Sequence, residues 1–471
     1  LLIKPGAIQR NAKLFNQKEI RVNQSSDAMV LDSSKCVLCG RCIAACQKLS
    51  GLGILNFNQR GSKTYVGPAL FHNMEDAGCI YCGKCIQSCP TGAIRAVDEV
   101  KDFERALRDK TKTVVVQVAP AVRAALGEEF GYKIGTNVEG QMFAALKELG
   151  VDEIMDTNFT ADLTILEEGS EFIDRLTNNK VLPMFTSCSP GWVNYLELYY
   201  PEYIPNLSSC KSPQQMAGAL IKTYYAKKMN KDPQDIVSVS IMPCVAKKAE
   251  ATRPEMGRDG YRDVDIVLTT REIARVIRHR GIPFRDLEPI HPYGVLASYT
   301  GAGSIFGATG GVMEAALRTI TEILEGHSTP VDFEDVRGLD NIKEATYIIK
   351  GQPVNVAVVH GGRAIKEFLE MMKTTDKQYH FVEFMGCTGG CVNGGGQPIV
   401  SAEIQEKVDV RARRAKVLYS IDELNTFRKS HESEAVKALY AEFLGKPNSH
   451  LSHELLHTTY RKRIPYSEVM K

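Results

Sequence analysis

Two runs of four cysteines near the start of the chain constrain this sequence more than any other feature. The first run, at residues 36–46, has the spacing C-x2-C-x2-C-x3-C, and residues 79–89 repeat that spacing and are followed by Pro90. Three thiolates on one tight loop can bind three corners of a 4Fe–4S cubane, and the fourth cysteine then begins a helix that points away. The spacing therefore predicts two 4Fe–4S clusters and a protein that moves electrons.

The fourth cysteine of each run determines how the eight thiols are shared. In ferredoxins with two such clusters, the fourth cysteine of one run ligates the other cluster. We therefore assign one cluster to Cys36, Cys39, Cys42 and Cys89, and the second to Cys79, Cys82, Cys85 and Cys46. Paired C-x2-C motifs also bind zinc, but two complete runs with a trailing proline favour iron–sulfur clusters.

The composition excludes several classes of protein. The 58 Lys and Arg residues nearly balance 56 Asp and Glu, which argues against a nucleic-acid binder that depends on bulk positive charge. No apolar run reaches the roughly 20 residues of a membrane span. Residues 1–23 lack the hydrophobic core of a signal peptide, so we expect a cytoplasmic protein. The 13 cysteines are an odd number in such a chain, which makes a disulfide framework unexpected.

The 471 residues divide into five segments by pattern. Residues 1–30 are a polar lead-in, and residues 31–95 contain both cysteine runs and are predicted to form a small α+β ferredoxin-like domain. Residues 96–112 are a charged linking helix. Residues 113–457 form the main domain, and residues 458–471 are a basic, polar tail.

Short apolar runs separated by helical patterns predict an α/β fold with parallel sheets in the main domain. The predicted strands lie at 114–118, 182–185, 237–241, 266–268, 354–359 and 381–385. Cys188, Cys244 and Cys387 each follow such a strand, and Cys391 comes about one turn later. Because ligands of these sheets bind beyond the carboxyl ends of the strands, the cysteines can converge on a third metal site.

The alternative for these cysteines is that they are buried small hydrophobic residues, as free cysteines often are. Glycines surround Cys391, at residues 389, 390 and 394–396. They favour a binding site because they let something approach the backbone closely.

Three segments of the main domain resemble, in order, the three signatures of iron-only (FeFe) hydrogenases. They are TSCSPGW at 186–192, MPCVAKKAE at 242–250 and FMGCTGGCVNGGGQP at 384–398. The stretches KSPQQ at 211–215 and GAGSIFG at 301–307 also resemble that family. The resemblance implies an α/β catalytic domain of two lobes, with parallel sheets flanked by helices, preceded by the small ferredoxin-like domain.

The resemblance also implies an H-cluster, which is a 4Fe–4S cubane joined through a cysteine sulfur to a diiron centre with CO, CN⁻ and a bridging dithiolate. By motif position Cys391 is the bridging thiolate, and Cys244 and Cys387 hold the cubane. Lys247 matches the donor of a charge-assisted hydrogen bond to a diiron cyanide. Four more residues are implied to line the pocket: Met242, Met385, Gln214 and Pro120.

The first signature departs from the family pattern, which has two adjacent cysteines, a proton-relay thiol and then the fourth cubane ligand. This chain has Cys188 followed by Ser189. In one outcome Ser189 ligates through its oxygen, a harder donor than a thiolate that should shift the cluster potential. In the other, Cys188 turns to ligate, and Ser189 or water serves in the relay.

The family's proton route matches Glu168, Ser208, Glu171 and Arg175, leading outward from Cys188. The two glutamates and the arginine lie at i, i+3 and i+7, on one helical face. Such a triplet is more often a surface salt-bridge stripe, so the relay requires burial and shifted pKa values. Cys210 has no assigned role, and a buried thiol is expected there.

The implied activity is reversible H₂ oxidation and proton reduction, with electrons relayed through the two 4Fe–4S clusters. Implied partners are a ferredoxin or electron-transfer subunits docking near residues 31–95, including formate dehydrogenase or NADH-linked chains in a multi-subunit complex, and maturation proteins for the diiron centre. Two alternatives stay open. One is a hydrogen sensor with little turnover, and the other is an iron–sulfur assembly factor of the same architecture without a diiron centre.

Overall fold

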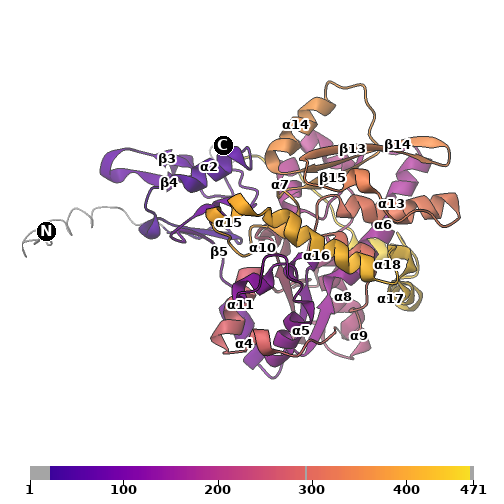
Figure 1. Cartoon of the computed structure of the whole chain (residues 1–471), viewed down its shortest axis with the longest axis horizontal. Helices are drawn as coiled ribbons and strands as arrows, with labels where there is room; N and C mark the ends of the chain where they lie inside the picture. The colour runs from indigo at the N-terminus through magenta and orange to yellow at the C-terminus, as the bar shows by residue number, and fades with distance from the viewer. Residues whose placement is uncertain (1–21, 292–293, 467–471) are drawn as a thin grey trace, which may run out of the picture.

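The two cysteine loops lie on a small unit at one end of the molecule (Figure 1). The computed structural model describes residues 22–291 and 294–466, and the expected lead-in (1–30) and tail (458–471) extend outside these ranges. The elements of the small unit are β1 (Val22–Asn23), β2 (Met29–Asp32), α2 (Arg41–Lys48), β3 (Asn56–Asn58), β4 (Tyr65–Gly67), α3 (Lys84–Ser88) and β5 (Ile94–Ala96). β1, β2 and β5 form an antiparallel sheet, and β3 and β4 pair as an antiparallel hairpin.

A glycine starts the helix that follows each cysteine loop. Gly40 precedes α2 and Gly83 precedes α3, and both have a left-handed backbone, with φ of 73° and 72°. Glycine adopts this conformation without the steric cost of a side chain. The Cys-Gly-x-Cys sequence therefore turns the chain from loop to helix.

The first large sheet has the strand order β12-β9-β6-β7, and all its neighbouring strands are parallel. Its strands are β6 (Thr113–Val118), β7 (Glu153–Asp156), β9 (Ile236–Met242) and β12 (Ile266–Thr269). Every residue of β6 is buried, as expected for a central strand covered on both faces. The apolar pattern predicted three of these strands and missed β7, whose four residues begin and end with an acidic side chain.

The second large sheet has the order β13-β14-β15-β8. Its strands are β8 (Met184–Phe185), β13 (Ile342–Ile349), β14 (Gln352–His360) and β15 (Phe381–Met385). β14, β15 and β8 are parallel, whereas β13 is antiparallel to β14. The turn between β13 and β14 consists of Lys350 and Gly351, which both have positive φ. The predicted parallel sheets are confirmed, and β13 adds an antiparallel edge strand that the sequence did not predict.

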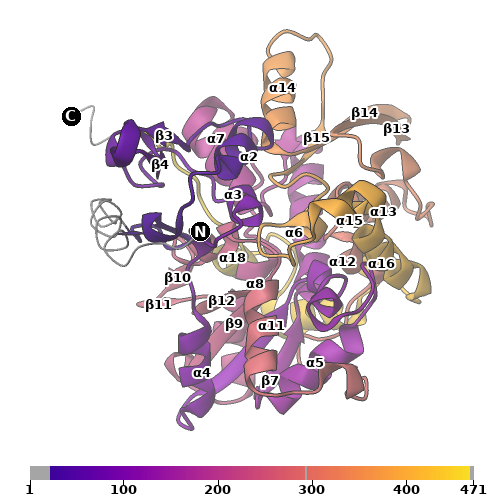
Figure 2. The same cartoon turned by 60° about the vertical axis from the view of Figure 1, so that its left-hand side comes forward.

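Helices cover both faces of each sheet. Figure 2 shows α4, α5 and α11 beside the first sheet and α14 beside the second. The helices are α4 (Val100–Arg108), α5 (Glu139–Glu148), α6 (Thr157–Thr177), α7 (Pro190–Tyr199), α8 (Pro213–Leu220), α9 (Ala226–Lys228), α10 (Ala246–Ala251), α11 (Thr270–His279), α12 (Gly301–Ile305), α13 (Gly311–Glu325), α14 (Gly362–Met372), α15 (Ala402–Lys407), α16 (Val410–Leu424), α17 (Glu434–Leu439) and α18 (His450–Leu456). Among the described residues, none of these is both long and apolar enough to cross a membrane.

Helix α6 packs between the two lobes. Phe159 and Leu163 belong to the apolar core beside the first sheet, and Ile165 and Phe172 belong to the core beside the second. The same helix carries Glu168 and Glu171 of the predicted proton route, and of these two Glu168 is buried.

Candidate functional site

The carboxyl ends of strands from both sheets meet around one apolar cavity. Pro120 follows β6, Cys188 follows β8, and Cys244 follows β9. The structure brings eight of the predicted site residues to its walls: Pro120, Cys188, Gln214, Met242, Cys244, Lys247, Met385 and Cys391. The strands place these residues together because each chain segment leaves its sheet at the same edge.

Three predicted thiols lie close enough to influence one another. Burial, followed by the charges of Cys387 and Cys391, raises the pKa of the Cys244 thiol. Burial and the neighbouring Cys387 raise the pKa of Cys391 to about 12. Neighbouring thiols whose charges would repel one another are suited to a metal cluster, which stabilises the thiolate forms. The donor set therefore fits an iron–sulfur group.

A buried carboxylate, Glu250, orients the polar side of the cavity. Lys247 Nζ donates to Glu250 Oε2 at 2.9 Å and to the carbonyl oxygen of Cys188 at 3.1 Å. Gln214 Nε2 and Ser212 Oγ donate to the same Glu250 oxygen, at 3.0 and 2.9 Å. The sequence assigned no role to Glu250, although its i,i+3 spacing from Lys247 was a usable signal.

Cys188 and Ser189 have different surroundings. Cys188 lines the cavity, and burial, then the charges of Glu168 and Cys391, raises the pKa of its thiol. Ser189 Oγ accepts a hydrogen bond of 3.1 Å from the backbone N–H of Gly386, the residue before Cys387. The two adjacent side chains therefore reach different parts of the site.

The predicted proton-route residues form a line that is buried at its inner end. Glu168 is 1 % exposed, and its carboxyl group lies close enough to the Ser208 side chain and the Ser187 backbone for hydrogen bonds from both to oppose the effect of burial on its pKa. Burial, and then the charge of Glu171, raises the pKa of Glu168 to about 8. Ser208 Oγ donates to Glu171 Oε2 at 2.8 Å, and Arg175 Nη2 donates to Glu171 Oε1 at 2.6 Å. Burial of Glu168 and Ser208 rules out a simple surface salt-bridge stripe.

The structure also brings together both predicted sets of four cysteines in the small unit. Cys36, Cys39, Cys42 and Cys89 line one small hollow. In the second set, burial and the charges of Cys82, Cys79 and Cys46 raise the pKa of Cys85. Each run therefore supplies its fourth cysteine to the other set.

The second set lies against the main domain at Gly83 and Gly395. A Cβ atom on Gly83 would lie 2.8 Å from Gly395 Cα, so the two backbones are in direct contact. Lys84 Nζ donates to the carbonyl oxygen of Asn393 at 2.7 Å, and Gln87 Nε2 donates to that of Gly394 at 2.9 Å. Burial and the nearby Cys387 raise the pKa of Cys82 to about 11.

The glycines around Cys391 were expected to let something approach the backbone. The groups that approach are other parts of this protein: the carbonyl oxygen of Pro243 at Gly394 and that of Cys82 at Gly395. These glycines therefore dock the small unit and the loop after β9 around the thiols.

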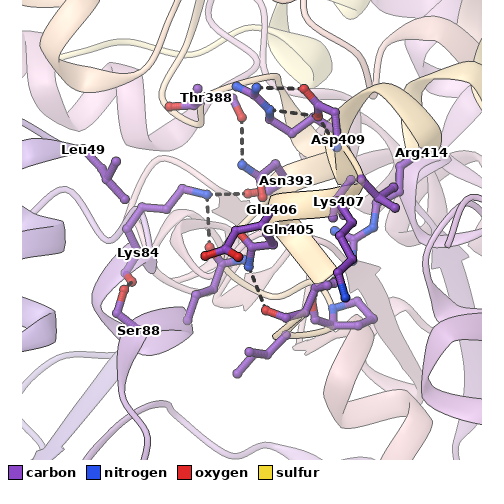
Figure 3. A pocket seen from close by; sticks show the side chains of 17 residues that line it. Leu49, Lys84, Ser88, Thr388, Asn393, Gln405, Glu406, Lys407, Asp409 and Arg414 are labelled. Carbon is purple, nitrogen blue, oxygen red and sulfur yellow. Dashed lines mark hydrogen bonds and ion pairs between the residues drawn. The ribbon is translucent and has the colours of Figure 1, made fainter. Parts of the chain in front are cut away.

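A larger hollow of about 590 Å³ lies beside this contact, between the small unit, the loop after β15 and helices α15 and α16 (Figure 3). Its polar groups are largely paired with one another, as with Lys84 on Asn393 and Arg411 on Asp409 at 3.0 Å. No cysteine is among the described residues that line it. It is a polar seam and not the site of the thiol chemistry.

Three protein-family models match the chain. They are "Iron only hydrogenase large subunit, C-terminal domain" over residues 112–395, "Iron hydrogenase small subunit" over 408–463, and "4Fe-4S dicluster domain" over 28–90. One polypeptide therefore contains regions similar to both hydrogenase subunit families.

The chain is also similar to known hydrogenases, to a solved hydrogenase structure and, at lower identity, to an assembly factor. The chain is 46% identical to Iron hydrogenase 1 of Clostridium pasteurianum, over 98% of this chain and 81% of that protein. It is 45% identical to the NADP-reducing hydrogenase subunit HndD of Solidesulfovibrio fructosivorans, over 93% and 75%. A cytosolic Fe-S cluster assembly factor of Xenopus tropicalis is 35% identical over 74% of each chain. A solved variant of the [FeFe]-hydrogenase of Chlamydomonas reinhardtii superimposes with a TM-score of 0.70 at 40% identity, covering 78% of this chain and 99% of that one.

Proposed function

This chain belongs to the iron-only (FeFe) hydrogenase family, which makes it an oxidoreductase acting on H₂, and we propose that the cavity lined by Cys391 is where the reaction occurs. When bound, the H-cluster would supply the redox chemistry that forms or splits H₂. Cys391 would tether its diiron part and Cys244 and Cys387 would hold its cubane. The observation that carries this proposal is that the thiols of three distant segments line or adjoin one apolar cavity.

Lys247 holds the anionic side of the site. Its ammonium is buried, donates a hydrogen bond of 2.9 Å to Glu250 Oε2 and faces the cavity, so it can also donate to an anionic ligand without rearrangement. Met242 and Met385 supply soft apolar walls that exclude water.

Ser189 takes the fourth position on the cubane side, and Cys188 is the relay thiol. The contact of Ser189 with the N–H of Gly386 places its oxygen beside the Cys387 loop, whereas Cys188 lines the cavity near Glu168. A backbone N–H donated to Ser189 Oγ also stabilises negative charge on that oxygen, as a ligating alkoxide requires.

Protons travel between Cys188 and the surface through Glu168, Ser208, Glu171 and Arg175. Glu168, with a pKa of about 8, holds a proton at neutral pH and can exchange it with a neighbouring group. The hydroxyl of Ser208 already donates to Glu171, and the Glu171 and Arg175 side chains are 14% and 10% exposed, which opens the route to water.

The eight cysteines of the small unit would hold two clusters, and these would supply the electron path to a ferredoxin-like redox protein. Val37 is 63% exposed and Phe57 is 52% exposed, and the Phe57 ring lies over Gly40, beside the exposed Cys39. This apolar patch covers the loop of the cluster assigned to Cys36, Cys39, Cys42 and Cys89, which we call the outer cluster, and a partner's cluster would need to come close to it.

Phe57→Ser tests the docking patch. The variant should raise the KM for ferredoxin and leave the rate with methyl viologen unchanged.

The relative that is named as a hydrogenase subunit supports assembly with further subunits. The cytoplasmic location stays a prediction.

Infrared spectroscopy of the matured protein tests the proposal. We expect bands of bound CO and CN⁻ together with H₂ turnover. Absence of those bands in matured protein would favour an assembly role, which similarity to assembly factors makes the second candidate. Bands without turnover would indicate a hydrogen sensor, the role that Ser189 keeps open.

A further inference from the structure

Three side chains with metal-ligating atoms meet at the outer end of the proton route. They are Glu171 on α6, Cys210 in the loop before α8, and His457 just after α18. One ligand atom from each lies within 4.8 Å of the other two. Neither Cys210 nor His457 is used by the proposed reaction.

Backbone pairing fixes Cys210 beside His457. The two residues form an antiparallel β-bridge. Lys211 N–H donates to the carbonyl oxygen of Leu456 at 2.7 Å, and Thr458 N–H donates to that of Ser209 at 2.8 Å. Side chains held from two backbone segments in this way need little reorganisation to share a ligand.

The hydrogen bonds of His457 orient one ring nitrogen toward the cluster. Nδ1 lies 2.8 Å from Ser209 Oγ, and the same hydroxyl is 3.3 Å from Glu171 Oε2, so Nδ1 is on the Glu171 side. Nε2 lies 3.2 Å from Glu167 Oε2. Despite its burial, hydrogen bonds from His457 and Ser452 help to lower the pKa of Glu167. A carboxylate on the far nitrogen is the usual support of a metal-binding histidine.

We propose that Glu171, Cys210 and His457 bind a divalent cation of the zinc class, and that the bound ion closes the proton route. The closure rests on the proposed function, because it requires protons to pass through Glu171. One sulfur, one imidazole nitrogen and one carboxylate oxygen form a ligand set that binds zinc in preference to magnesium or calcium, which both favour oxygen ligands alone.

Binding would interrupt the route at one defined hydrogen bond. Ser208 Oγ donates to Glu171 Oε2, and a cation on that carboxylate competes with the donated proton and with Arg175. Cys210 would lose its thiol proton to solvent as the sulfur–metal bond forms, so Glu171 and Cys210 together balance the two positive charges. Because binding releases a proton, the affinity should rise with pH.

Zinc inhibition of the matured holoenzyme tests the closure. We expect Zn²⁺ to inhibit H₂ oxidation with methyl viologen as acceptor, Mg²⁺ to have no effect, and EDTA to restore the rate. Cys210→Ser and His457→Gln should keep the uninhibited rate and need about tenfold or more zinc for the same inhibition. His453→Ala is the matched control, because this exposed ring stacks on His457 at 4.3 Å and is not one of the three ligands.

X-ray absorption at the zinc edge tests the site independently of activity. We expect one Zn–S distance of about 2.3 Å in the wild type and its loss in Cys210→Ser. Absence of that sulfur in the wild type, or equal inhibition of all variants, would overturn the site. A zinc–sulfur signal with full turnover would overturn the closure, and with it the exit through Glu171, while the site would stand.

Discussion

The ferredoxin-like unit and the catalytic domain hold their thiols in opposite ways. The small unit takes eight cysteines from residues 36–89, and Cys39 is exposed to solvent. The catalytic domain takes its thiols from loops that follow strands of two different sheets and gathers them around one cavity between the lobes. The first arrangement is a local property of the chain, and the second exists only when both sheets have formed.

The difference predicts separate dependence on metal. A small unit buries a small fraction of its surface and relies on bound clusters for stability, because ligand binding and folding are linked. The catalytic cavity is surrounded by the cores of both large sheets, whose buried residues are apolar side chains outside the proposed set of thiol ligands. Losing a ligand should therefore affect structure in the first region and chemistry in the second.

Cys391→Ala should have the largest effect, a loss of H₂ turnover to the background level. The variant removes the proposed tether of the diiron centre from the cavity wall. Electron paramagnetic resonance should still show both 4Fe–4S clusters of the small unit. Loss of those signals as well would show that the two regions are not independent.

Glu168→Gln should lower turnover by about 10² to 10⁴, the usual contribution of a positioned proton-transfer group. The amide has nearly the same volume but cannot give up and regain a proton near neutral pH, so the proton transfer should be lost and the spectra of all clusters should be unchanged. Assays of H₂ evolution and oxidation measure the effect. A rate close to wild type would place the proton route elsewhere.

The same variant should change how stability depends on pH. The folded pKa of about 8 lies above the unfolded value of about 4.3, so the folded wild type retains a proton that the unfolded chain loses. The free energy of unfolding of the wild type should therefore fall as pH rises between these values and level off above pH 8. In urea titrations between about pH 5 and 8, the Glu168→Gln variant should lack this decrease of unfolding free energy with pH. An identical decrease in the variant would contradict the raised pKa of this carboxyl group.

Cys36→Ala should affect the small unit alone. It removes one ligand of the outer cluster, so turnover with ferredoxin should fall more than turnover with a small viologen. Thermal unfolding of the small unit should begin at a lower temperature than in the wild type. The infrared bands of the H-cluster should be unchanged. Their loss would mean that the small unit is needed to form the catalytic cavity.

Ser189→Cys should have the smallest effect on rate and a clear effect on potential. A thiolate is a softer donor than an alkoxide and stabilises the reduced cubane better, so the reduction potential of the cubane should rise. Redox titration followed by paramagnetic resonance measures this change, with Cys188→Ser as the comparison. A potential that moves only in Cys188→Ser would make Cys188 the ligand.

Patterns in the sequence were sufficient wherever neighbouring residues act together. The cysteine runs predicted which thiols gather, because two glycines turn the chain directly into α2 and α3. The apolar runs predicted β6, β9, β14 and β15, since buried strands need continuous apolar residues. They missed β7 and β13, whose alternating or acidic residues resemble those of exposed segments.

The sequence by itself determined the donor set, namely which cysteines, which lysine and which acidic residues are available and how they are spaced. Only the tertiary structure decided their surroundings: that Glu250 holds Lys247, that Cys188 and Ser189 reach different sides, and that Cys210 lies beside His457. Donor chemistry belongs to each side chain, whereas burial and distance depend on segments far apart in the chain, which come together only when the two lobes pack around α6.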